Sequence, residues 1–302
     1  MENKPLISFL LLTYNQENFV RDALDGAFSQ TYSPLEIIIS DDASNDNTAK
    51  VIEEYISNYH GPHKVIFHHN EKNVGIAQNV NNAMALASGE YFILAAGDDK
   101  SLPERAQRTY EIFSRYPEAT CINFTSIQCD ETLTPLRNPN FTPPTQSLSL
   151  INIYDYCEFA DFLIWSGDAR SIRRTLYDTF GPLVKGEDED STYFFRGLLL
   201  GTVGHSQEQQ SFRRNHIQQV SNWQNIKKHN SENIIAQPLL DIQKAFTIGV
   251  ITHQTAGLFK YKIKCADRLF ADQYYEATSC WYKMLYVRPI NLLRRVKNKI
   301  FK

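Results

Sequence analysis

Apolar and polar positions along the first half of the chain predict strands and helices in alternation. Short apolar runs are typical of buried strands, and apolar residues repeated every three or four positions are typical of amphipathic helices. The segment 17–29 shows the helical spacing, with Phe19, Val20, Ala23 and Leu24 on one face. The predicted strands are 6–12, 35–40, 64–68, 90–95 and 121–127, and the predicted helices are 17–29, 45–59, 76–88 and one opened by Pro103.

This order of elements predicts an α/β fold with a largely parallel sheet and helices on both faces. Ser44 or Asn45 is expected to cap the helix over 45–59, because either side chain can accept a hydrogen bond from the first turn. The alternation ends at 132–149, which is rich in Pro, Thr, Asn and Ser. We expect this segment to be a long surface loop near a site.

Composition narrows the class of protein. The 302 residues are 42% hydrophobic and 22% charged, which describes a soluble globular chain. No run of 18 apolar residues occurs, and 6–12 is too short for a signal peptide. The five cysteines form no Cys-x-x-Cys pair, so neither a disulfide framework nor a zinc site is predicted, and a cytoplasmic location fits. No dinucleotide fingerprint or phosphate-binding glycine loop is present, and no nucleic-acid partner is expected.

Charge is distributed unevenly along the chain. Residues 226–302 hold 14 Lys and Arg against 5 Asp and Glu, whereas residues 1–225 hold 17 against 29. Within 291–302, Leu293, Val296 and Ile300 recur at helical spacing among basic residues. Two arrangements stay open for this basic helix: it lies on an anionic membrane surface, or it packs on the catalytic domain or on a partner subunit.

Two acidic pairs stand where predicted strands end. Asp41 and Asp42 follow one apolar run, and Asp98 and Asp99 follow another. The carboxyl ends of parallel strands line the ligand crevice of an open α/β sheet, and adjacent carboxylates there suit a divalent cation beside a phosphate. The alternative for the first pair is a plain turn and helix cap. The sequence therefore predicts one polar site that suits a hard divalent cation beside a phosphate.

Several blocks around these pairs follow a known pattern. They are Ser8 to Asn15, Gln30-Thr31-Tyr32, Glu36 to Ile39, Asp41 to Thr48, Asn73 to Asn79 and Ala96-Gly97-Asp98-Asp99. Together they resemble the family 2 glycosyltransferases, which have the GT-A fold and act on nucleotide-sugar donors. The last block stands at the family's metal-binding Asp-x-Asp-Asp element, with Ala96 in place of the first aspartate. Metal binding would then rest on Asp98, with Asp99 close by, and would be weaker or more dependent on the donor diphosphate.

The resemblance implies roles for donor-site residues in the first hundred positions. The nucleotide-sugar would be bound by Thr13, Tyr14, Asn15, Glu17, Asp42, Gly75, Asn79 and Asp98. Within this set, the turn of Thr13 to Glu17 would grip base and ribose, and Asp42 would accept a hydrogen bond from the base. The metal, Mg²⁺ or Mn²⁺, would be held by Asp98 and Asp99.

A second region resembles the family's acceptor-side Glu-Asp segment. It comprises Phe180-Gly181-Pro182-Leu183, Glu187-Asp188-Glu189-Asp190 and Arg196. In the family pattern an arginine follows the catalytic aspartate by six residues, which selects Asp190 as the base and leaves Asp188 as the alternative. Contacts to acceptor or phosphate are implied for Trp165, Asp168, Glu189, Arg213 and His216, with Arg214 as an alternative to Arg213.

The predicted function is inverting transfer of a sugar from a nucleotide-diphosphate donor to a hydroxyl of a glycan or lipid-linked acceptor in surface polysaccharide synthesis. Residues 1–225 would be the GT-A catalytic domain, divided into a donor half 1–100 and an acceptor half 101–225. Residues 226–302 would be a basic helical extension, open to peripheral contact with the inner membrane face or to a homo-oligomer. Two alternatives are a nucleotidyltransferase, whose glycine-rich phosphate loop is absent from 13–17, and a non-catalytic nucleotide-sugar-binding protein, suggested by Ala96.

Overall fold

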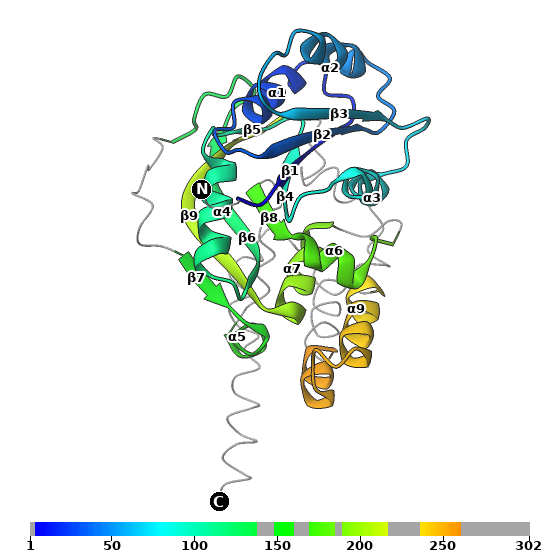
Figure 1. Ribbon diagram of the computed structural model, residues 1–302, viewed down its shortest axis with the longest axis vertical. Coiled ribbons are helices and arrows are strands. Elements are labelled where there is room, and N and C mark those ends of the chain that lie inside the picture. The colour runs from blue at the N-terminus through cyan, green and yellow to red at the C-terminus, as the bar shows by residue number, and fades with distance from the viewer. Residues whose placement is uncertain (1–3, 138–147, 160–168, 185–188, 217–235, 261–302) are drawn as a thin grey trace, which may run out of the picture.

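The computed structural model describes residues 4–137, 148–159, 169–184, 189–216 and 236–260, and within them nine strands form one sheet (Figure 1). The sheet order is β3-β2-β1-β4-β8-β6-β9-β5, with β7 beside β9. The strands are β1 (Ile7–Thr13), β2 (Leu35–Asp41), β3 (Lys64–His69), β4 (Tyr91–Ala96), β5 (Lys100–Ser101), β6 (Ala119–Cys129), β7 (Leu148–Ile151), β8 (Arg170–Arg173) and β9 (Thr202–Arg214). The helices are α1 (Val20–Phe28), α2 (Thr48–Ser57), α3 (Ile76–Leu86), α4 (Arg105–Arg115), α5 (Ile153–Phe159), α6 (Arg174–Phe180), α7 (Glu189–Leu200) and α9 (Ala236–Thr247).

The predicted α/β class and the parallel sheet of the first half are confirmed. Strands β3, β2, β1 and β4 run parallel, with Ile7 opposite both Leu35 and Tyr91. The other half is mixed, because β8 is antiparallel to β4 and β6, and β5 and β7 are antiparallel to β9. The hydrophobic pattern did not predict β8 and β9, since both strands carry mainly polar side chains.

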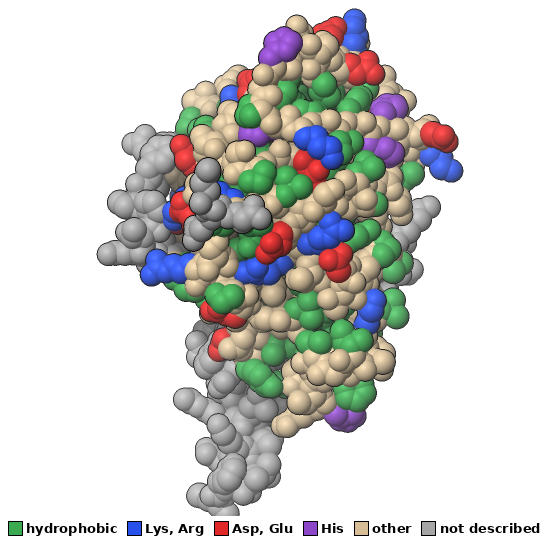
Figure 2. Space-filling model, in the orientation of Figure 1, with side chains coloured by type: hydrophobic (Ala, Val, Ile, Leu, Met, Phe, Trp, Pro, Cys, Tyr) green, Lys and Arg blue, Asp and Glu red, His purple; other side chains and the backbone are tan. Residues whose placement is uncertain are grey.

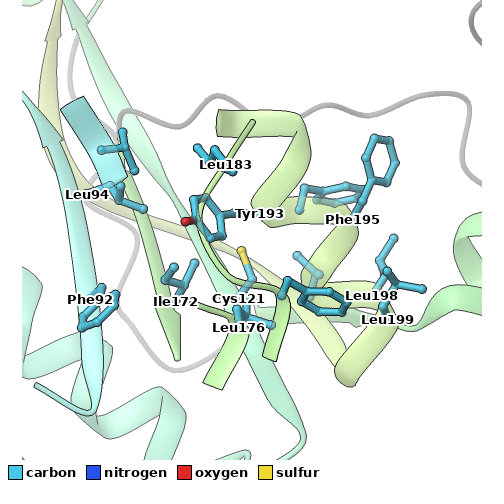
Figure 3. Packing of buried hydrophobic residues seen from close by; sticks show 14 of the residues in the cluster. Phe92, Leu94, Cys121, Ile172, Leu176, Leu183, Tyr193, Phe195, Leu198 and Leu199 are labelled. Carbon is cyan, nitrogen blue, oxygen red and sulfur yellow. The ribbon is translucent and has the colours of Figure 1, made fainter. Parts of the chain in front are cut away.

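Helices cover both faces of the sheet, as predicted. Side chains alternate along β1, so that Ile7, Phe9 and Leu11 join one core while Leu10 and Leu12 join the other. The first core is completed by α1, α2 and α4, and the second by α3, α6, α7 and α9. Figure 3 shows part of the second core, where side chains of β4, β6, β8, α6 and α7 converge.

Two local predictions are wrong. Helix α2 begins at Thr48 rather than Asn45, and Asp46 Oδ1, not Ser44, accepts the Thr48 amide hydrogen at 2.9 Å. Ser44 is instead bonded to Asp41 at 2.6 Å between Oγ and Oδ1. The irregular loop predicted up to residue 149 ends earlier, because Leu148 starts β7 against β9.

None of the described helices has the length and apolar character needed to span a membrane. In Figure 2, basic and acidic side chains are interspersed over the face in view. The basic helix predicted over 291–302 lies outside the described residues.

Acid is expected to weaken the fold through His63. Burial lowers the pKa of His63 below 6.5, although its hydrogen bond to the Gln30 carbonyl opposes the shift. The unfolded chain then binds a proton at a pH where the folded chain does not, so the stability present above pH 6.5 falls as the pH drops below it. We expect the urea midpoint to fall less between about pH 7.5 and about pH 5.5 in His63→Gln than in the wild type.

The exposed neighbour His60 offers the matched control. His60→Gln should show the pH dependence of the wild type, because the His60 side chain is exposed in the folded chain as it is in the unfolded chain. If His63→Gln and the wild type lost equal stability between about pH 7.5 and about pH 5.5, the role given to His63 would be contradicted.

Candidate functional site

The loops after β1 and β2 are bonded to each other at the carboxyl edge of the sheet. Thr13 Oγ1 donates to Asp41 Oδ1 at 2.8 Å, and the Asn15 amide donates to Ser44 Oγ at 2.8 Å. Glu17 Oε2 accepts the Asn47 amide hydrogen at 2.9 Å. These bonds bring together Thr13, Asn15 and Glu17, three of the residues predicted to bind the nucleotide-sugar.

The side chains in this surface differ in their access to a ligand. Thr13 is buried and its hydroxyl is bonded within the protein, whereas Tyr14 is 42% exposed. Asn15 has a positive φ of 52° and accepts the Asn45 amide hydrogen through Oδ1 at 2.8 Å. The exposed ring of Tyr14 is therefore the side chain of this loop that offers the most apolar surface for stacking.

Asp42 is fixed by the chain that leads into α3. Its Oδ1 accepts the Val74 amide hydrogen at 2.8 Å and its Oδ2 accepts that of Gly75 at 2.9 Å. Asn70 Nδ2 donates to Asp42 Oδ1 and to Asn79 Oδ1, both at 3.0 Å. Gly75 has a φ of 85°, which favours glycine. The predicted residues Asp42, Gly75 and Asn79 thus belong to one hydrogen-bonded network.

The Gly97-Asp98-Asp99 turn packs against the β1 loop. The Gly97 amide donates to the Leu12 carbonyl at 2.8 Å. A Cβ at Gly97 would lie 2.3 Å from Gln16 Oε1 and 2.7 Å from Thr13 Cγ2. A side chain at this position would force Gln16 and Thr13 to move, so the close approach of this turn to the β1 loop favours glycine.

Arg214, the last residue of β9, holds this turn in place. Its amide donates to Asp99 Oδ1 and its Nε donates to the Asp98 carbonyl, each at 2.8 Å. Its Nη2 donates to Asp22 Oδ2 of α1 at 2.7 Å, and the whole residue is buried. Side chains alternate along a strand, so Arg213 lies on the opposite face of β9. Arg214 therefore supports the acidic turn, and the phosphate contact of Arg213 stays a prediction.

His216 lies against Asp98 beside this support. Its Nε2 is 2.9 Å from Asp98 Oδ2, and both side chains are nearly buried. The ring packs on Phe19 with centroids 4.6 Å apart, and the Arg214 guanidinium lies over the same Phe19 ring. The pairing of Asp98 with His216 across 118 positions joins two residues that were predicted separately.

A carboxylate oxygen and an imidazole nitrogen this close are two suitable ligands for Mn²⁺, and the oxygen also suits Mg²⁺. Among the described residues, no group of three or more His, Cys, Asp or Glu side chains could hold a metal. Asp99 Oδ1 is already bonded to the Arg214 amide. The residues therefore fit a cation that takes its remaining ligands from a bound molecule.

Asp190 occupies the first turn of α7. Its carboxylate is 32% exposed and its Oδ1 is 3.4 Å from Arg170 Nη1, which also bonds its backbone carbonyl. Arg170 is fixed in turn by Asn123 Oδ1 at 2.8 Å. Because Ser171 of β8 pairs with Ile93 of β4, Arg170 stands toward the carboxyl end of β4. Asp190 is thereby brought to the edge of the sheet where β4 leads into Asp98.

Some predicted residues lie outside the described ranges. They are Trp165, Asp168 and Asp188, so the choice between Asp188 and Asp190 stays open. Glu189 precedes Asp190 in α7 and is partly exposed. Sequence reasoning missed the supporting residues Phe19, Asp22, Asn70 and Arg170, whose roles come from partners far along the chain. Asp22 alone carried a weak signal, an acidic side chain in the first turn of a helix.

The family model for glycosyl transferase family 2 matches residues 8–180. The chain belongs to this family. Over 116 residues it is 37% identical to the uncharacterized protein Rv1520 of Mycobacterium tuberculosis, a match that covers 38% of this chain and 33% of that protein. It is 29% identical over 116 residues to the putative glycosyltransferase EpsE of Bacillus subtilis, covering 38% of this chain and 41% of EpsE. The chain thus spans between a third and two fifths of the length of these relatives.

Solved structures of low sequence identity share the GT-A-like fold of this family 2 chain. TarS of S. aureus in complex with UDP-GlcNAc superposes with a TM-score of 0.65 at 13% identity, covering 91% of this chain and 74% of TarS. The mannosyltransferase PcManGT from Pyrobaculum calidifontis, in complex with GDP-Man and Mn²⁺, gives a TM-score of 0.57 at 14% identity. The match covers 99% of this chain and 81% of PcManGT. These likenesses confirm the predicted fold class.

Proposed function

We propose that this chain is an inverting glycosyltransferase that moves a sugar from a nucleotide-diphosphate donor to a hydroxyl group. The observation that carries the proposal is the position of Asp42 after β2 and of Asp98, 2.9 Å from His216 Nε2, after β4, at the carboxyl edge of two strands that both pair in parallel with β1. Membership of glycosyl transferase family 2 supports it. Neighbours of the same fold bind UDP-GlcNAc and GDP-Man, which supports a nucleotide-sugar as the donor class.

The donor nucleotide would be bound by the linked loops after β1 and β2. Each carboxylate oxygen can accept two hydrogen bonds, and Asp42 Oδ2 has one bond within the described residues, from Gly75. Asp42 can therefore accept a further bond from a base N–H, and Tyr14 offers its exposed ring to the base or ribose. Thr13 shapes this site through Asp41 rather than through its buried hydroxyl.

The cation would be held by Asp98, with His216 beside it and the donor diphosphate completing its coordination. A bound Mg²⁺ or Mn²⁺ acts as a Lewis acid that stabilises charge on the departing diphosphate. Arg214 keeps Asp98 and Asp99 in place for this role. Asp99, whose Oδ1 accepts the Arg214 amide hydrogen, would be the second carboxylate beside the cation. No three His, Cys, Asp or Glu side chains form a metal site within the described residues, which fits the predicted dependence on the donor diphosphate.

Asp190 would act as the general base. A hydroxyl is a poor nucleophile at neutral pH, and a carboxylate within hydrogen-bond reach can remove its proton as the new bond forms. Arg170 orients Asp190 through the bond to its backbone carbonyl and the contact with Oδ1. The acceptor oxygen bonds to the anomeric carbon as the diphosphate leaves from the opposite side, and this single displacement inverts the configuration.

The acceptor would be a glycan or a lipid-linked glycan in surface polysaccharide synthesis. The excess of Lys and Arg in 226–302 suits contact with an anionic membrane surface, and a homo-oligomer through this region is the other arrangement proposed. Peripheral attachment to the inner face of the membrane follows from the first arrangement.

A thermal-shift screen tests the donor class. The purified chain is heated with UDP-, GDP-, dTDP- and CMP-sugars, with and without Mn²⁺. A ligand that binds the folded state stabilises it by about 2.7 kcal/mol at a hundred times its Kd, so one nucleotide class should raise the melting temperature by several degrees, and more so with Mn²⁺. The free sugars are the control. No shift with any of the four classes would contradict the proposal.

A further inference from the structure

A buried ion pair joins α7, which carries Asp190, to α9 of the C-terminal extension. Arg196 Nε donates to Asp241 Oδ2 at 2.8 Å, and Arg196 Nη2 donates to Asp241 Oδ1 at 3.3 Å. The side chains are 0% and 3% exposed. The guanidinium also lies over the rings of Phe180 and Tyr193. Two charges removed from water in this way hold each other firmly, because neither has solvent as an alternative partner.

The ion pair belongs to a larger clamp on the segment before α7. Gln237 Nε2 donates to Asp241 Oδ1 at 2.9 Å, while Gln237 Oε1 accepts the Val184 amide hydrogen at 2.8 Å. Arg196 Nη1 donates to the Gly181 carbonyl at 2.8 Å. One turn of α9 therefore holds Arg196 in the middle of α7 and the backbone of Val184, and Arg196 in turn holds the backbone of Gly181.

The same segment is fixed from the donor half. Asn81 of α3 donates through Nδ2 to the Leu183 carbonyl at 2.8 Å and accepts the Leu183 amide hydrogen through Oδ1 at 2.7 Å. Helix α3 begins next to Gly75, whose amide binds Asp42. Asp190 lies six residues before Arg196 on α7, so the position of its side chain depends on how this helix is held.

We propose that Asp241 is a positioning residue for sugar transfer, acting through Arg196 and Gln237 to fix the first turn of α7 and thereby the carboxylate of Asp190. The inference rests on the proposed role of Asp190. If the inference holds, α9 contributes to catalysis, although the domain division predicted from the sequence places this helix in the C-terminal extension, 226–302. Asp241 itself touches no reactant.

Asp241→Asn tests this with two independent readouts. Amide hydrogen exchange should become at least about tenfold faster in the first turn of α7 and stay unchanged in β1 and in the turn around Asp98. In kinetics, kcat should fall about tenfold while the KM for the donor and the nucleotide-induced thermal shift keep their wild-type values. Lys244→Ala, on the exposed side of the same helix, is the matched control and should match the wild type in both readouts.

A second variant covers the case in which Asp241→Asn fails to fold. Gln237→Leu removes the bonds to Val184 and Asp241 but leaves the ion pair, so the same changes are expected at smaller size. Wild-type exchange in the first turn of α7 with wild-type kcat, in a folded variant, would overturn the proposal. Faster exchange spread evenly over the chain, with donor binding lost in parallel, would also overturn it.

A different result is expected if the chain does not have the proposed glycosyltransferase function. In that case the wild type shows neither transfer nor a nucleotide-induced shift. The exchange readout needs neither, and it still decides whether the clamp orders the first turn of α7.

Discussion

Replacing Asp98 by Asn should lower kcat/KM for sugar transfer by about a thousandfold. The substitution keeps the size of the side chain and removes the negative charge that faces His216 Nε2 at 2.9 Å. A metal that stabilises a departing diphosphate contributes several kcal/mol, and each ~1.4 kcal/mol is a factor of ten in rate. The measurements are steady-state transfer and the thermal shift with donor, each with and without Mn²⁺.

The thermal shift separates loss of metal binding from loss of the fold. In Asp98→Asn the extra shift produced by Mn²⁺ should vanish, while the bond from the Arg214 side chain, through Nε, to the backbone carbonyl of Asp98 remains and keeps the turn folded. Asp178→Asn is the matched control, because Asp178 is an exposed carboxylate paired with Arg174 on α6. It should behave as the wild type. Full activity and an intact Mn²⁺ effect in Asp98→Asn would disprove the role given to Asp98.

Replacing Asp190 by Asn should lower kcat by about 10² to 10⁴ and leave donor binding intact. General base catalysis contributes in this range, and Asn cannot accept the proton of the acceptor hydroxyl. The carboxamide can still contact Arg170, so the first turn of α7 should keep its place. The measurement is the rate of transfer at saturating donor, beside the nucleotide-induced thermal shift of the same sample.

The neighbouring acidic pair supplies the decisive comparison. Asp188→Asn made in parallel should retain most of the wild-type kcat if Asp190 is the base. The reverse result, with kcat lost in Asp188→Asn and kept in Asp190→Asn, would assign the base to Asp188. Asp98→Asn and Asp190→Asn also differ from each other, since the first should abolish the Mn²⁺ effect on donor binding and the second should not.

The sequence by itself determined the fold of the first hundred residues. The strands β1, β2 and β4 are short apolar runs, and the helices between them repeat apolar residues every three or four positions, so both are local properties that can be read from neighbouring positions. Acidic residues follow β2 and β4, and the parallel order of these strands brings them to one edge of the sheet. The family resemblance then supplied the predicted metal ligands and the predicted base.

Only the tertiary structure decided what holds these residues in place. Strands β8 and β9 have few apolar side chains, so their pairing with β4 and β6 was not predicted. For the same reason the partners of Arg170 and Arg214, which lie on these strands, were not predicted either. The ion pairs of Arg214 with Asp22 and of Arg196 with Asp241 span 192 and 45 positions. A buried charge must find an opposite charge wherever the fold places one, and sequence distance carries no information about that choice.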